Sequence, residues 1–83
     1  MPGILIIEDT DEDLNLAIKI LTSSGYQVTG TAKDGESGLK QYSDISPELV
    51  IIDLILPGMN GIETLHKIRD IDPSACIILC TSA

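Results

Sequence analysis

The stretch LVIID, residues 49–53, is a run of four aliphatic residues that ends in a carboxylate. A short continuous apolar run of this kind is typical of a strand buried on both faces of a parallel sheet. A carboxylate is costly to bury without a partner, so Asp53 should stand at an exposed strand end. A second run, ILII at residues 4–7, ends the same way, in Glu8 and Asp9.

Segments with a helical apolar period alternate with these strand-like runs. In the first of these helical segments, apolar side chains recur three or four positions apart, as in an amphipathic helix. Turn signals mark where each segment begins and ends. The first helix is expected from Asp11 to Gly25, the second from Asp34-Gly35 to Ser46-Pro47, and the third from Asn60 to Asp72-Pro73.

Two further strands complete the pattern. Residues 26–31 alternate polar and apolar side chains, which is typical of an edge strand with one solvated face. Residues 76–81 form another apolar run. Four strands alternating with three helices predict an α/β fold, a parallel sheet with helices on both faces and right-handed crossovers.

The polar second strand belongs at an edge, which gives the strand order 2-1-3-4. The first and third strands are then neighbours at the point where the winding direction reverses. Open α/β sheets bind ligands there, at the carboxyl ends of the strands. We therefore expect Glu8, Asp9 and Asp53 to meet at one hard-cation site.

The composition narrows the class of protein. The 83 residues allow one domain, and two Tyr are the sole aromatic residues, so the core must be aliphatic. A net charge of −8 disfavours nucleic-acid binding, which needs a basic surface. No apolar run reaches the length of a membrane span, and the start does not resemble a signal peptide. We expect a soluble, cytoplasmic protein without a membrane partner.

Cys76 and Cys80 lie four positions apart on the last predicted strand. On one face of a strand they would be about 13 Å apart, at roughly 3.3 Å per residue. That separation is too long for a disulfide within the chain. We expect two reduced cysteines that act as small apolar residues.

Together these residues resemble the receiver domain of two-component response regulators. The resemblance covers residues 3–83 and rests on the acidic pair Glu8-Asp9, on Asp53 at the end of the third strand, and on spaced residues after it. Those residues are Pro57, Gly61 and Thr81. The family implies a three-layer, flavodoxin-like sheet, with one receiver domain at residues 1–83.

The resemblance implies a phosphoacceptor. A histidine kinase or phosphotransfer protein would supply the phosphoryl group, and Asp53 would accept it. Mg²⁺ would be held by Glu8, Asp9, Asp53 and the backbone carbonyl of Ile55, with Glu8 acting through a water. Thr81 would donate its hydroxyl to the phosphoryl group as a switch, and Ser82 matches the family's small residue.

The sequence departs from the family at its end, because receivers continue with a helix, a strand and a helix after the fourth strand. The fifth strand carries a lysine that pairs with the phosphoryl group, and no residue up to Ala83 matches it. We therefore expect an incomplete receiver with impaired signalling. Its fourth strand would be a flat, uncharged edge that self-associates.

Two functions stay open, a phosphoacceptor module and a non-signalling fragment that self-associates through the fourth strand or uncovered sheet faces. An aspartate-nucleophile phosphatase is less favoured, because such enzymes prefer a second Asp where this chain has Ile55. A dinucleotide-binding half is also disfavoured, because the first turn, residues 8–11, is acidic and lacks Gly.

Overall fold

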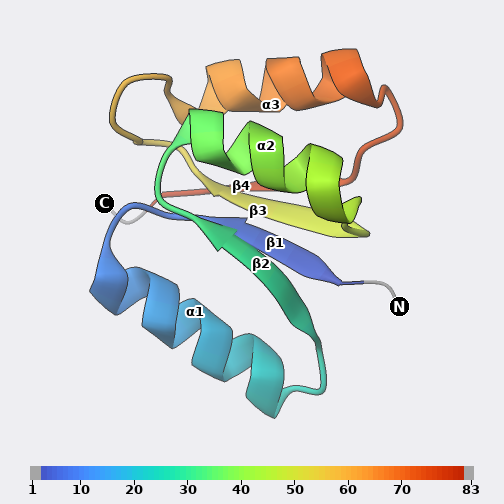
Figure 1. The fold of residues 1–83 in the computed structure, drawn as a ribbon. Helices are drawn as coiled ribbons and strands as arrows, with labels where there is room; N and C mark the ends of the chain where they lie inside the picture. Colours follow the sequence, from blue (N-terminus) through green and yellow to red (C-terminus); the bar gives the residue numbers. More distant parts are fainter. Residues whose placement is uncertain (1–2, 82–83) are drawn as a thin grey trace.

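The computed structural model describes residues 3–81, and in this range four strands alternate with three helices (Figure 1). They are β1 (Ile4–Ile7), α1 (Asp11–Ser23), β2 (Val28–Ala32), α2 (Gly35–Ile45), β3 (Leu49–Asp53), α3 (Gly61–Ile71) and β4 (Ile77–Cys80). The order of elements is the predicted one. The boundaries shift by two residues at β2, which begins at Val28 rather than at residue 26, and at α1, which ends at Ser23 rather than at Gly25.

The strands form one parallel sheet in the order β2-β1-β3-β4, as predicted. The central pair is β1 and β3, with Ile7 opposite Ile52. Glu8 and Asp53 each follow these two residues, so both leave the sheet at the same edge. The next pair, β3 and β4, places Asp53 opposite Cys80.

The helices make the two outer layers. Figure 1 shows α1 on one face of the sheet and α2 with α3 on the other. Alternate strand residues point to the two faces. One core therefore joins Ile4 and Ile6 to Leu14 of α1, and the other joins Leu5, Ile7, Val50 and Ile52 to Tyr42 of α2 and Ile68 of α3.

The isoleucines of α3 are buried only in the middle of the helix. Ile68 is buried, whereas Ile62 and Ile71 at the two ends are exposed. A spacing of three drifts around a helix of 3.6 residues per turn, so residues nine positions apart lie about 180° apart. The face against the core instead includes Gly61 and Thr64, two small residues.

A capping box fixes the start of α3. The Asn60 side chain accepts a hydrogen bond from the Glu63 N–H at 2.9 Å, and Glu63 accepts one from the Asn60 N–H at 3.4 Å. This pair satisfies two N–H groups that a helix start otherwise leaves free. The capping box confirms the prediction that the third helix begins at Asn60. It also sets the end of the loop that leads from β3.

Candidate metal centre

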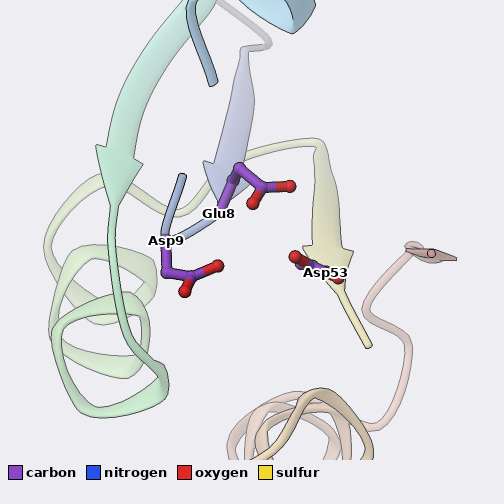
Figure 2. Close-up of side chains that lie close together, drawn as sticks. All are labelled: Glu8, Asp9 and Asp53. Carbon is purple, nitrogen blue, oxygen red and sulfur yellow. The ribbon is translucent and has the colours of Figure 1, made fainter. Parts of the chain in front are cut away.

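Three carboxylates converge at the carboxyl edge of the sheet. Glu8 and Asp9 follow β1, and Asp53 ends β3 (Figure 2). One oxygen of each side chain lies within 4.8 Å of the others. The parallel register of β1 and β3 produces this convergence, because both strands run to the same edge. The structure thus brings together the three acidic side chains that the sequence predicted.

The expectation that Asp53 stands at an exposed strand end was wrong: Asp53 is buried at 5% exposure, because it is held from two sides. Its Oδ1 accepts a hydrogen bond from the Ile55 N–H at 3.1 Å. The next residue, Leu54, donates its N–H to the Cys80 carbonyl at 2.7 Å and accepts from the Gly61 N–H at 3.0 Å. Strand β4 and the start of α3 therefore fix the backbone around Asp53.

Gly61 is a positioning residue for this strand end. A Cβ at residue 61 would collide with the backbone carbonyl of Asp53 and with Cα of Leu54. Those atoms are backbone and cannot rotate away, so only glycine lets α3 begin this close to the strand. The sequence predicts that Gly61 lies at the start of the third helix, but no local sequence pattern indicates this contact between α3 and β3.

Glu8 is half-buried beside Asp53. The pKa of the Glu8 carboxyl is raised from 4.5 to about 7, mainly by burial and also by the neighbouring Asp53 carboxylate. A hydrogen bond from the Thr10 N–H to Glu8, at 3.2 Å, acts in the opposite direction. A neighbouring carboxylate disfavours the charged form of Glu8 in this way when no cation neutralises the pair.

The donor set suits a hard divalent cation. Carboxylate oxygens are the ligands that Mg²⁺ and Ca²⁺ prefer in proteins, and Asp9 is exposed, which leaves the site open to solvent. Ile55 donates its backbone N–H to the Asp53 carboxylate, and the Ile55 side chain is exposed. The role of the Ile55 carbonyl as a ligand remains a prediction.

Thr81 directly follows Cys80, the register partner of Asp53, so it lies at the same edge of the sheet. Its role as a switch remains a prediction, and Ser82 lies outside the described residues. The loop between β3 and α3, residues 54–60, contains no Lys or Arg. The basic residue that follows a strand is Lys33, after β2, and it forms an ion pair with Asp11.

Comparison with known proteins places the chain in a family. The model of the response regulator receiver domain matches residues 4–83. The chain therefore belongs to the response regulator receiver domain family, which is a family of signalling domains. No helix in the described part of the chain is long and apolar enough to span a membrane.

Among its relatives, the chemotaxis protein CheY of Thermotoga maritima is 35% identical over 79 residues, which cover 95% of this chain and 66% of that protein. The transcriptional regulatory protein AfsQ1 of Streptomyces coelicolor is 40% identical over 80 residues, covering 95% of this chain and 35% of the relative. The chain thus spans just under two thirds of the length of the Thermotoga CheY that it matches.

Solved receiver structures share the fold. The response regulator TrrA of Thermotoga maritima, in complex with Mg²⁺-BeF, superposes with a TM-score of 0.93 at 35% identity, covering 100% of this chain and 71% of TrrA. A chain of the CheX-CheY-BeF3-Mg²⁺ complex from Borrelia burgdorferi gives 0.94 at 28% identity, covering 99% and 63%. TrrA has also been solved in complex with the histidine kinase ThkA.

Proposed function

We propose that this chain is the phosphoacceptor module of a two-component phosphorelay. Asp53 would accept a phosphoryl group from a histidine kinase or phosphotransfer protein. Mg²⁺ would be held by Glu8, Asp9, Asp53 and the backbone carbonyl of Ile55. The observation that carries this proposal is the convergence of three carboxylate oxygens within 4.8 Å of one another, at the end of a buried strand, in a chain of the receiver family.

The proposed reaction is a transfer between two nucleophiles. A carboxylate oxygen of Asp53 attacks phosphorus and forms an O–P bond, while the P–N bond to the donor imidazole breaks. The imidazole keeps the electron pair of that bond and takes up a proton. The hydrogen bond from the Ile55 N–H orients the Asp53 carboxylate, and the contact with Gly61 holds the backbone beneath it.

The charge at the site explains why a cation is needed. Glu8, Asp9 and Asp53 would repel an incoming phosphoryl group, and burial together with the neighbouring Asp53 carboxylate raises the pKa of Glu8 to about 7. A bound Mg²⁺ supplies charge neutralisation between the carboxylates and the phosphoryl oxygens. The TrrA structure with Mg²⁺-BeF supports this assignment by similarity.

Thr81 is proposed as the switch. Its place after Cys80, beside the strand that carries Asp53, suits a hydroxyl that donates to a phosphoryl oxygen and draws its loop inward. The partners would be proteins rather than nucleic acid, because a net charge of −8 disfavours nucleic-acid binding. Beyond accepting and losing the phosphoryl group with Mg²⁺, no enzymatic activity is proposed.

The proposal is tested by labelling with acetyl phosphate and Mg²⁺, followed by intact mass spectrometry. The parent chain should gain the mass of one phosphoryl group, and Asp53→Asn should gain none. Asp44→Asn is a matched control, because Asp44 is exposed on α2 and away from the cluster. We expect slow labelling in low yield, because the loop after β3, residues 54–60, has no Lys or Arg to neutralise the phosphoryl group. Equal labelling of parent and Asp53→Asn would overturn the assignment.

A further inference from the structure

The start of α2 packs directly onto the end of β1. A Cβ at Gly38 would collide with Cδ1 of Ile7 and would lie 2.9 Å from its Cγ1. Ile7 is fully buried in the core under α2 and α3, and in a close-packed interior its side chain has no empty space to turn into. The height of α2 above β1 is therefore set by this contact, which requires that residue 38 has no side chain.

The contact lies directly beside the acidic cluster. Ile7 is the last residue of β1, and Glu8 and Asp9 are the next two residues of the chain. The Glu8 N–H donates a hydrogen bond to the carbonyl of Ala32 at 2.9 Å. Ala32 ends β2, and only two residues separate it from the start of α2. The backbone at Glu8 is thus joined to α2 twice, through the side chain of Ile7 and through the short loop after β2.

A second glycine holds α2 against α3, its neighbour on the same face of the sheet (Figure 1). A Cβ at Gly35 would collide with Oγ1 of Thr64. Thr64 is fully buried, and its hydroxyl donates a hydrogen bond to the Asn60 carbonyl at 2.8 Å. The start of α3 also packs against the backbone of Asp53. Helix α2 therefore connects the part of the acidic cluster that follows β1 to the part that ends β3.

We propose that Gly38 is a positioning residue for the metal centre, which acts through Ile7 to set where Glu8 and Asp9 stand relative to Asp53. This inference rests on the proposed function, because it takes the three carboxylates as the ligands of Mg²⁺. Gly38 is not a ligand itself. Changes to residues that hold metal ligands in place typically lower metal affinity by about 10–100-fold.

Mg²⁺ affinity, followed by amide shifts in the loops after Ile7 and Asp53, tests the proposal. Gly38→Ala should bind Mg²⁺ about tenfold more weakly than the parent. Ile7→Val removes Cδ1, the atom nearest the added methyl group, so Gly38→Ala/Ile7→Val should regain most of the lost affinity. Ile6→Val is the matched control, because Ile6 packs on the other face of β1, with Leu14 of α1. Gly38→Ala/Ile6→Val should bind as weakly as Gly38→Ala.

Amide hydrogen exchange in EDTA separates positioning from a general loss of stability. The Glu8 N–H bonds to the Ala32 carbonyl beside α2, whereas the Leu54 N–H bonds to the Cys80 carbonyl on the other side of the cluster. Gly38→Ala should lose more protection at Glu8 than at Leu54, because only the end of β1 is displaced. Equal losses at the two amides would overturn the proposal, as would unchanged Mg²⁺ affinity in folded Gly38→Ala, since a purely structural contact gives these results.

The two readouts distinguish a failure of this inference from a failure of the proposed function. If the parent binds no Mg²⁺, the proposed metal site is wrong, and exchange in EDTA alone decides whether Gly38 sets the position of Glu8. If Gly38→Ala does not fold, the two double variants decide. Gly38→Ala/Ile7→Val should then fold and bind Mg²⁺, and Gly38→Ala/Ile6→Val should remain unfolded. Recovery in both double variants, or in neither, would overturn the proposal.

Discussion

Gly61 packs directly against the backbone carbonyl of Asp53, in a space that no other residue could occupy without displacing backbone atoms. The contact joins the start of α3 to the end of β3, eight positions earlier in the chain. A capping box at Asn60 and Glu63 holds α3 in this place. The position of the proposed phosphoacceptor therefore depends on a helix start as well as on its own strand.

Gly61→Ala should destabilise the fold by about 1–3 kcal/mol, because an added methyl group in a packed site forces backbone shifts. Urea unfolding of this variant and the parent measures the change. Asn15→Ala on the exposed surface of α1 is the control, with an expected change within about 0.5 kcal/mol. If Gly61→Ala unfolds at the same urea concentration as the parent, the close packing is not present in solution.

The hydroxyl of Tyr42 donates a hydrogen bond to Asp72 at 2.9 Å, which ties α2 to the end of α3. Tyr42→Phe should lower the free energy of unfolding by about 1 kcal/mol, the usual net worth of such a bond. Tyr26→Phe is the matched control, because Tyr26 is exposed at 59%, and it should change little. Equal losses in the two variants would contradict the account of this bond.

The Tyr42–Asp72 pair also has a pH dependence. Hydrogen bonds from the Ser74 side chain, from Tyr42 and from the Ser74 N–H hold the pKa of Asp72 below its ordinary 3.8. A lowered pKa stabilises the fold above 3.8, and this stability is lost as the pH falls through the lower value. In Tyr42→Phe the pKa of Asp72 should lie closer to its ordinary 3.8. The variant should therefore lose less stability than the parent as the pH falls from neutral to acidic. Acid unfolding curves of the two chains measure this difference.

Glu8 should make the metal-free protein less stable as the pH rises. The folded pKa is about 7 and the ordinary value is 4.5, so the folded state holds its proton longer than the unfolded state. Stability from this group is present below 4.5 and is lost as the pH rises through about 7. Urea midpoints in EDTA, below and above this window, should fall less with pH in Glu8→Gln. Glu36→Gln, exposed in the first turn of α2, should keep the slope of the parent, and an unchanged slope in Glu8→Gln would contradict the assignment.

Mg²⁺ should bind at the acidic cluster and compete with the proton on Glu8. Titration followed by amide chemical shifts should move signals in the loops after Ile7 and Asp53, and the affinity should fall as the pH drops through about 7. Asp9→Asn should weaken binding, since it removes a ligand and a charge. Small shifts spread evenly over the acidic residues would instead indicate a diffuse ion atmosphere.

Much of this arrangement could be predicted from the sequence. The polar alternation of residues 26–31 predicted that β2 lies at an edge, and that position made β1 and β3 neighbours. The end of a buried strand can be recognised in the sequence, because a carboxylate is costly to bury without a partner and therefore follows the apolar run. The convergence of Glu8, Asp9 and Asp53 followed from these two facts.

The features that could not be predicted depend on contacts between distant segments. The approach of Gly61 to Asp53 is set by how α3 packs on the sheet, and a glycine in sequence does not show what lies beside it. The burial of Thr64 also could not be predicted. Its hydroxyl donates a hydrogen bond to the Asn60 carbonyl at 2.8 Å, which allows this polar side chain to be buried.

The central claim, that Asp53 is the residue which accepts the phosphoryl group, is tested most directly by mapping the modified residue. The chain is labelled with acetyl phosphate and Mg²⁺, and borohydride then reduces the aspartyl phosphate to homoserine. Tandem mass spectrometry of the peptides locates that residue. We predict homoserine at residue 53 and at none of the other acidic residues, with no homoserine when EDTA replaces Mg²⁺. Homoserine at Glu8, Asp9 or a surface carboxylate in place of residue 53 would contradict the claim.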